Sequence, residues 1–474
     1  MFSRSMLAAG VLLVLAACGG DSDAAIAGGN ATSPRSEPTE TLLRIAADGG
    51  EPLAYRADNL AELDWEGAPR LPAVEQVVGA GADERIVYVL DRRRGLIGLD
   101  LESGRFREIV GGIRAATPAP DGGVVAVDTG GTALRIRRRT PQALRGSLEG
   151  EPGALFPTQR GGVIAAGGRG LAVLGADHPP VQIGFPDGPA AATMWGELVA
   201  AATDSGLVFF DPRDGDSTRF VATERPVHAV GFSPSGHRVY AATPDAELLV
   251  LDRFGEAVLE RIELPGAAGA LRVDRYGRWL LARPVVGDSL WVVDLVADSL
   301  VGSARGAWNY DLPAVTGGRL IVRQGDDVVS LDLRAVGLPR RGVVQDGGAD
   351  RWTLIQWTPG GEPPAPVLAG DDAPSDDPRD TGANADSLDG GGSGAPVYLQ
   401  VSSSRNPDWA SDLVQQMRSA GLPATLLDPT AEGEPYRVVL GPYRSRDEAD
   451  EAGRKLGRAY FIIGGDNPAP PEAP

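Results

Sequence analysis

The chain has 474 residues, a formal net charge of −19, 64 glycines, 38 prolines and one cysteine. This length exceeds that of one ordinary domain, so two or more domains are expected. A single cysteine can form no internal disulfide and no thiolate zinc site, and the negative charge argues against binding to nucleic acid. Hydrophobic residues make up 42% of the chain, which is enough for a folded core.

Residues 1–17 are predicted to be a signal peptide. They begin with a short positive segment and continue in the apolar run Met6–Leu15, which is too short to span a bilayer as a helix. The sequence Leu15–Cys18 resembles the lipobox of bacterial lipoproteins, which implies that Cys18 becomes the first mature residue and carries a lipid. The alternative is a plain secretory signal with a chance cysteine. Residues 18–41 are rich in Gly, Ala, Ser, Asp and Pro, so we expect a flexible tether.

Residues 42–357 repeat a pair of short apolar strands seven times, at intervals of roughly 36 to 41 residues. The pairs are Ile86–Asp91 with Leu96–Leu101, Val124–Asp128 with Ala133–Arg137, Val163–Gly167 with Leu171–Gly175, Leu198–Thr203 with Leu207–Asp211, Val239–Thr243 with Leu248–Asp252, Trp279–Arg283 with Leu290–Leu295, and Leu320–Gln324 with Val328–Leu333. A period near 40 with about four short strands per repeat is typical of a β-propeller.

The seven pairs predict about seven blades in a mainly β fold. The segment Phe232–Thr243 resembles the blades of YVTN-type and WD40-like propellers, whereas the other repeats are degenerate. Leu43–Ala46 and Trp352–Trp357 are further strand candidates at the two ends of this region, and one of them is a candidate to complete a terminal blade. A β-sandwich array is the rival interpretation of the same strands.

The propeller region offers few residues for catalysis. Four aspartates that end strands are expected to cap turns through their carboxylates: Asp91, Asp128, Asp211 and Asp252. The chain has three histidines, and His228 is expected to pack in the core because it lies in an alternating strand. No metal-ligand spacing and no nucleophile elbow is visible. We therefore predict no catalytic residue, no metal and no cofactor.

Two arginine clusters interrupt this acidic chain. They are Arg92–Arg94 and the group Arg135 with Arg137–Arg139. Each is either a local anion site or an ordinary solvated surface, and we favour the solvated surface.

A second folded module is predicted after an acidic linker. Residues 358–395 hold eight acidic residues and one arginine with almost no large apolar side chain, so they are expected to be disordered. Residues 396–465 have the order β-α-β-β-α-β of a ferredoxin-like domain, with residues 466–474 as a tail. In the first helix, Asn406–Pro407 suits the start, Trp409, Leu413 and Met417 form an apolar stripe, and Gly421 fits the end.

The module resembles the SPOR domain, which binds peptidoglycan glycan strands that have lost their stem peptides. The matching motifs are the first strand Val397–Val401, the run Tyr436–Tyr443, and Ser445–Ala449 at the start of the second helix, where Ser445 and Glu448 form a capping box. The resemblance implies a glycan-binding sheet face with Gln400, Ser403 and Arg437. Alternation of side chains in the strand adds Tyr398 and Ser402 to this outward face. The family's Gly-Ser-Phe is replaced here by Ser402–Ser404, and Pro435 stands where some members carry an aromatic residue, so weaker glycan stacking is expected.

These features together predict a non-catalytic envelope lipoprotein. Its lipid on Cys18 would hold it on the periplasmic side of the inner or outer membrane, and its SPOR-like module would bind denuded glycan. The propeller would present a surface to a protein partner, and the family implies enrichment at the division septum. The alternative is an envelope enzyme with a lactonase- or quinoprotein-like propeller that the module localises to the wall.

Overall fold

The computed structural model describes residues 40–360 and 397–463, with short gaps. The gaps are 81–84, 120–122, 138, 149–151, 159–161, 168–169, 176–178, 184–187, 195, 213–216, 254, 256, 405–406, 420–421, 430–435, 446–447, 450–451 and 454–460. The predicted signal peptide, Cys18, most of the tether, most of the acidic linker and the tail lie outside the described residues. None of the described helices is long and apolar enough to cross a membrane.

Within residues 40–360, the described strands form eight four-stranded antiparallel sheets. Four of them, each written from its innermost strand outward, are β32 (Arg351–Ile355), β1 (Thr41–Ile45), β2 (Leu53–Arg56) and β3 (Glu62–Leu63); β4 (Val74–Ala80), β5 (Ile86–Asp91), β6 (Leu96–Asp100) and β7 (Arg105–Val110); β8 (Ile113–Pro118), β9 (Val124–Asp128), β10 (Thr132–Arg137) and β11 (Thr140–Ser147); and β12 (Ala154–Pro157), β13 (Val163–Gly167), β14 (Gly170–Leu174) and β15 (Val181–Ile183).

The other four sheets continue in chain order. They are β16 (Ala190–Ala192), β17 (Val199–Thr203), β18 (Gly206–Phe210) and β19 (Ser217–Ala222); β20 (Ala229–Phe232), β21 (Arg238–Ala242), β22 (Glu247–Asp252) and β23 (Val258–Glu263); β24 (Ala268–Val273), β25 (Trp279–Pro284), β26 (Ser289–Asp294) and β27 (Ser299–Arg305); and β28 (Ala314–Thr316), β29 (Arg319–Gln324), β30 (Asp327–Asp332) and β31 (Arg340–Val344).

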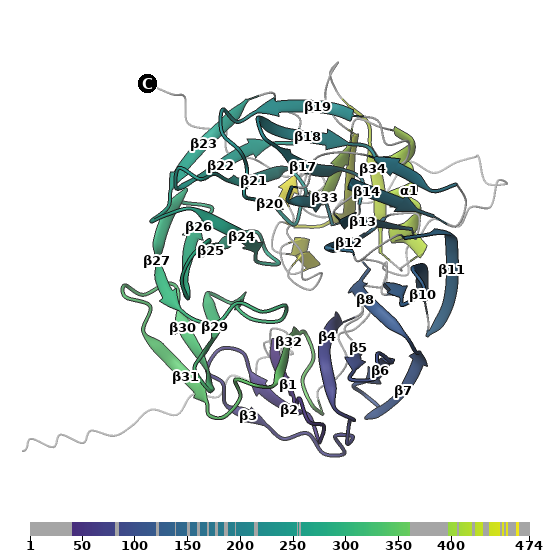
Figure 1. Ribbon diagram of the computed structural model, residues 1–474, viewed down its shortest axis with the longest axis vertical. Helices are drawn as coiled ribbons and strands as arrows, with labels where there is room; N and C mark the ends of the chain where they lie inside the picture. Colours follow the sequence, from purple (N-terminus) through teal and green to yellow (C-terminus); the bar gives the residue numbers. More distant parts are fainter. Residues whose placement is uncertain are drawn as a thin grey trace, which may run out of the picture. The chain divides into compact units, whose positions relative to one another are not determined.

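The sheets follow one another around a ring, as blades of a β-propeller (Figure 1). Strands β4, β8 and β24 lie toward the middle of the ring, whereas β7, β11 and β27 form its rim. The seven predicted strand pairs are the two middle strands of seven blades. The propeller is therefore confirmed, and the described residues give it eight blades where the sequence predicted about seven.

The middle strands are apolar on both faces because each blade packs between two others. In β9, for example, Val124, Val125, Ala126 and Val127 are all fully buried. They divide between two separate core clusters, with Val124 and Ala126 in one and Val125 in the other. A strand that packs on both faces needs an apolar residue at every position, and this explains the continuous runs in the sequence.

The eighth blade joins the two ends of the propeller sequence. Its innermost strand β32 pairs antiparallel with β1, and the register runs from Thr41 opposite Ile355 to Ile45 opposite Arg351. The fully buried Trp352 of β32 packs against Tyr55 of β2, with their ring centroids 5.9 Å apart. Both unassigned strand candidates thus belong to one blade, which closes the ring.

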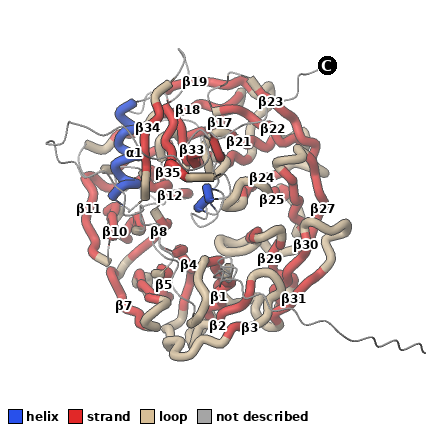
Figure 2. Tube along the Cα trace, turned by 180° about the vertical axis from the view of Figure 1, so that it is seen from behind, coloured by secondary structure: helices blue, strands red, loops and turns tan. Residues whose placement is uncertain are grey.

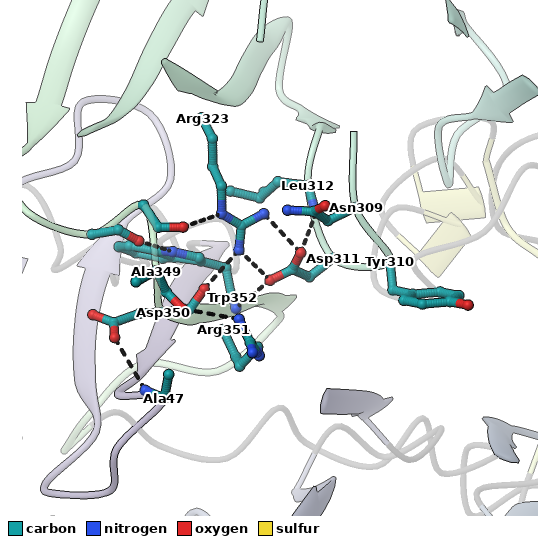
Figure 3. A network of polar contacts seen from close by, with 12 residues as sticks. Ala47, Asn309, Tyr310, Asp311, Leu312, Arg323, Ala349, Asp350, Arg351 and Trp352 are labelled. Atoms are coloured by element: carbon teal, nitrogen blue, oxygen red, sulfur yellow. Dashed lines mark hydrogen bonds and ion pairs between the residues drawn. The ribbon is translucent and has the colours of Figure 1, made fainter. Parts of the chain in front are cut away.

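A buried ion pair lies beside the start of β32, the strand that closes the ring (Figure 3). Arg323 donates from Nη1 and Nη2 to the two carboxylate oxygens of Asp311, at 2.8 and 2.6 Å. Burial favours the neutral acid, but these bonds and the charge of Arg323 outweigh it and hold the pKa of Asp311 below its usual value. Asp311 also accepts from the backbone N–H of Trp352, so the pair fixes β32 to β29.

The second folded part is a four-stranded sheet with a helix. The strands are β33 (Val397–Ser404), β34 (Ala424–Leu427), β35 (Tyr436–Tyr443) and β36 (Phe461–Ile463), in the sheet order β34-β35-β33-β36, and the helix is α1 (Pro407–Ser419). Figure 2 shows α1 as the longer of the helical segments drawn in blue. Residues 448–449 and 452–453 are also helical, which gives the predicted β-α-β-β-α-β order of a ferredoxin-like domain.

Candidate functional site

The core of the C-terminal domain lies on one face of its sheet. Buried side chains of α1 pack there against alternate residues of three strands. The helix supplies Ala410, Leu413, Val414 and Met417, and the strands supply Val397, Leu399, Val401, Ala424, Val438 and Leu440. The predicted inward direction of Val397, Leu399 and Val401 is confirmed. Tyr398, Gln400 and Arg437 alternate with these core residues, so they belong to the opposite face.

A β-bulge in β33 changes this alternation. Gln400 pairs with Val439 of β35, but the next paired residue of β33 is Ser402, opposite Val438. One residue of β33 is therefore extra, and Val401 and Ser402 both face the helices. Ser402 is only 1% exposed, and its Oγ has no hydrogen-bond partner among the described residues. The prediction that Ser402 faces outward is wrong, because strict period-two alternation does not survive a bulge.

The same bulge pairs the backbone of Ser403 with Arg437. The side chain of Ser403 lies outside the described residues, so the position that the family motif assigns to this serine stays a prediction. The sequence interpretation missed a further polar residue of the face opposite the helices, Thr425 of β34, which pairs with Val439 on the far side from Gln400. The alternation in β34 could have revealed it, because Ala424 is buried in the core and Thr425 is not.

The Gly-Pro-Tyr end of β35 has a geometric reason. Gly441 has a φ of 124°, which disfavours residues with a Cβ atom. A Cβ atom there would also lie 3.1 Å from the backbone oxygen of Val397, on the neighbouring strand β33. Glycine therefore lets β35 approach β33 closely where the register between the two strands shifts. The motif supports the shape of the sheet and need not touch a ligand.

The two helix termini confirm the sequence interpretation where the structure describes them. The N–H of Glu448 donates to Ser445 Oγ at 3.1 Å, and the Glu448 carboxylate accepts from the N–H of Arg444 at 2.7 Å. This is a capping box in which the Glu448 carboxylate accepts from the N–H of the residue before Ser445, and not from that of Ser445 itself. At the end of α1, the N–H of Leu422 donates to the backbone oxygen of Met417, the type of bond that closes a helix C-terminus. Asn406, Gly421 and the side chain of Trp409 lie outside the described residues.

In the propeller, three of the four strand-end aspartates cap turns as predicted, and the prediction for Asp211 stays untested. Asp91 Oδ1 accepts from the N–H groups of Arg93 and Gly95, at 2.8 and 2.7 Å. Asp128 and Asp252 accept in the same way from Thr132 and Gly255. Among the described residues, no group of three or more His, Cys, Asp or Glu could hold a metal ion.

His228 and the arginine clusters depart from the expectations in part. His228 is exposed in the loop before β20, so the prediction of a core histidine is wrong: the alternating strand begins one residue later, at Ala229. Arg92 and Arg94 are exposed and pair with Asp48 and Glu75, as expected of a solvated surface.

Arg135 differs from its cluster because it lies in the middle strand β10. It is only 4% exposed, and burial lowers its pKa to about 10.

Comparisons with known proteins support the division into two parts. Residues 393–461 match the model of the SPOR domain, so the C-terminal part is a SPOR domain. No curated protein matches the chain. Among solved structures, the chain resembles the dihydro-heme d1 dehydrogenase NirN in complex with DHE, with 15% identity, coverage of 67% of this chain and 78% of that chain, and a TM-score of 0.47. It also resembles apo AztD from Citrobacter koseri, with 10% identity, coverage of 67% and 98%, and a TM-score of 0.48. At these sequence identities and TM-scores, neither protein indicates an activity, a metal or a substrate for this chain.

Proposed function

We propose that this protein is a non-catalytic component of the cell envelope that binds denuded glycan strands of peptidoglycan through its SPOR domain. The observation that supports the proposal is the register and core packing of β33 and β35, which put Gln400 and Arg437 on the sheet face opposite the helices; the family motif adds Ser403 to them. An amide, a hydroxyl and a guanidinium group can bond to sugar hydroxyls, N-acetyl groups and lactyl carboxylates. Tyr398 and Thr425 extend this polar face at its two sides.

Lipidation of Cys18 and a periplasmic location complete the proposal. A lipid at one end and a glycan-binding domain at the other would hold the protein between a membrane, inner or outer, and the wall. Denuded glycan arises where amidases remove stem peptides during division, so we expect enrichment at the septum. Metabolic labelling with a palmitate analogue tests the lipid: label on the wild-type chain and its loss in Cys18→Ser are expected, and label that persists in Cys18→Ser would contradict the assignment.

Binding to purified sacculi tests the glycan site. The full chain should sediment with sacculi treated with an amidase and much less with untreated sacculi. Gln400→Ala combined with Arg437→Ala should lose most of this binding. Arg444→Ala is the matched control, because Arg444 is exposed in the same domain but follows the sheet. Binding that ignores amidase treatment would refute the denuded-glycan assignment, and equal loss in the control would refute the residue assignment.

We further propose that the propeller presents a surface to a protein partner. The β25–β26 loop and the β27–β28 loop, which leads to the next blade, start at the same end of the sheet and expose Val286 and Tyr310, at 86% and 87%. The guanidinium of Arg272 donates to the backbone oxygens of Asn309 and Pro313 and so ties the second loop to β24. An exposed tyrosine offers a large contact area with few rotatable bonds, and tyrosine is enriched among the residues that dominate binding at interfaces.

Photocrosslinking from position 310 tests this surface. A photoreactive residue there should capture one defined protein in cells, and the same probe at Tyr436 in the SPOR domain should not. Tyr310→Ala should abolish co-purification of that protein but leave sacculus binding unchanged. Capture of no protein from position 310 would contradict the proposal for this loop.

A further inference from the structure

The chain enters and leaves the propeller at one end of a single strand pair. Thr41, the first residue of β1, lies directly opposite Ile355, the last residue of β32. The first residue of β1 and the last residue of β32 are therefore neighbours. β32 has no second strand partner, since it is the last strand in its sheet, whereas β1 also pairs with β2. Any tension between the two ends of the chain passes through the β1–β32 pair.

A tyrosine from another blade bridges the two strands at this end. The hydroxyl of Tyr276, in the loop between β24 and β25, donates to Glu40 Oε1 at 3.1 Å and accepts from Gln356 Nε2 at 3.3 Å. Glu40 immediately precedes β1, and Gln356 immediately follows β32. Arg275 lies beside the same carboxylate, 3.6 Å away. The outgoing chain is held once more by Trp357, whose ring packs edge-on against Trp65 with centroids 4.8 Å apart.

The opposite end of the pair is held by more and stronger bonds. The Arg323–Asp311 ion pair, with side chains 3% and 8% exposed, binds the backbone N–H of Trp352, the second residue of β32. Asp350, just before β32, accepts from Arg44 Nε of β1 at 2.5 Å and from the N–H of Ala47 at 3.1 Å. Figure 3 shows the contacts of Asp311 with Arg323 and Trp352 and that of Asp350 with Ala47. Both ends carry charge-assisted bonds, but the Arg323 and Asp311 side chains are 3% and 8% exposed, whereas those of Arg275 and Glu40 are 26% and 12% exposed. Water competes less for the more deeply buried pair, so we expect that end to resist rupture more.

The direction of load decides how such a strand pair fails. Ladder hydrogen bonds run perpendicular to the strands. When the two strands are pulled apart from the same end, the bonds nearest that end carry the whole load and break one after another. When the strands are pulled from opposite ends, all ladder bonds share the load.

We propose that the β1–β32 pair is a tension-sensitive closure of the propeller, which opens from Thr41 and Ile355 and stops at Trp352. The source of the tension rests on the proposed function, because a lipid at one end and glycan at the other would pull on Glu40 and Gln356 in opposite directions. Opening as far as Trp352 would release the three residues Thr353–Ile355, about 10 Å of extended chain. It would also leave the inner edge of β1 without its partner strand.

Force spectroscopy on single molecules tests the closure without glycan or membrane. The full chain carries Cys18→Ser, so that the engineered cysteines are its only thiols. Handles at Thr39→Cys and Thr358→Cys pull both strands from the same end. Handles at Glu51→Cys, in the β1–β2 loop, and Thr358→Cys load the pair in shear. We expect the first opening in the same-end geometry at a force at least about twofold lower than in shear, with a short reversible step.

Tyr276→Phe sharpens this test because it removes the bridging hydroxyl but keeps the ring. The rate of first opening in the same-end geometry should rise at least about fivefold, the effect of one lost hydrogen bond, because the bonds to Glu40 and from Gln356 are both removed, and the shear force should not change. Tyr310→Phe is the matched control, since Tyr310 is exposed and distant in the chain from this end. It should change neither measurement.

Equal opening forces in the two geometries would overturn the inference, as would first release of any other blade. So would an unchanged opening rate in Tyr276→Phe. None of these outcomes bears on glycan binding, because the SPOR domain lies outside the stretch of chain between the handles. Conversely, loss of the proposed sacculus binding would remove the source of tension but would leave the mechanical result intact.

Discussion

The propeller and the SPOR domain use the same element, a four-stranded antiparallel sheet, but bury it differently. Each middle strand of a propeller blade packs on both faces, as in β9, where neighbouring residues belong to different core clusters. The SPOR sheet has its core on one face, under α1. A sheet with two buried faces has only loops and edges to offer a partner, whereas a sheet with one core face can use the other for a ligand. Function is therefore expected in the propeller's loops and on the SPOR domain's strands.

The largest expected effect comes from the ion pair that closes the propeller. Arg323→Ala leaves the buried carboxylate of Asp311 without its charge partner and should destabilise the propeller by roughly 3–5 kcal/mol. Thermal unfolding monitored by tryptophan fluorescence measures this change. Arg341→Ala, which removes an exposed partner of Asp332, is the control and should cost less than about 1 kcal/mol. If both variants lose equal stability, Arg323 is not central to ring closure.

The SPOR domain should respond to the loss of its own core. Leu413→Ala removes a fully buried side chain of α1 and should cost roughly 2–5 kcal/mol of that domain's stability. Hydrogen exchange resolves the two parts: amides of β33 and β35 should exchange faster, and those of the propeller blades should not. Faster exchange throughout the chain would show that the two cores are not independent.

Alkaline pH should weaken the propeller through Tyr240. Burial is the main cause that raises the pKa of Tyr240 to about 12, so the folded state keeps its proton where the unfolded chain, with a pKa near 10, loses it. Stability is thus fully present below pH 10 and is lost as the pH rises toward 12, by about 1.4 kcal/mol at pH 11. Denaturant unfolding at pH 9 and 11 measures this loss, which Tyr240→Phe should reduce. An equal reduction in Tyr310→Phe would argue against burial as the cause.

The bulge in β33 predicts a small but opposite pair of effects. Ser403→Ala should weaken sacculus binding a few-fold, by roughly 1 kcal/mol, because it removes one polar partner of the glycan. Ser402→Ala should leave binding unchanged and should keep or slightly raise stability, since it removes a buried hydroxyl without a described partner. Sedimentation with amidase-treated sacculi compares the two. If only Ser402→Ala weakened binding, the Ser402 side chain would have to lie on the glycan face and not on the helix face that the register indicates.

The local pattern predicted seven blades because each repeat carries its own strands and turn residues. Strand-end aspartates such as Asp91 and the Ser445–Glu448 capping box were predictable for the same reason: their partners lie within four residues. The eighth blade was not, because β1 and β32 come from opposite ends of the propeller sequence. Asp311 and Arg323, which fix β32, carry no local sign of their partnership with Trp352.

The sheet face that we propose to bind glycan was predicted in part. Period-two alternation placed Tyr398 and Gln400 opposite the core residues, and the family motif chose Ser403. The error at Ser402 arose because a bulge is set by how β33 fits the Gly441 end and the middle of β35, which the sequence of one strand does not reveal. The predictions for Arg135 and His228 were wrong for a related reason, because each depends on where a strand lies in the fold. Arg135 is buried because it lies in a middle strand, and His228 is exposed because it lies in a loop, one residue before the strand begins.

The most direct test of the central claim is a titration of the chain with soluble glycan oligomers that lack stem peptides, followed by NMR of the SPOR domain's amides. We expect saturable chemical-shift changes at the amides of Gln400, Ser403, Thr425 and Arg437, with little change along the core-facing residues of α1. Oligomers that keep their peptides should cause no such changes. Shifts confined to α1, or equal shifts with both oligomers, would contradict this claim.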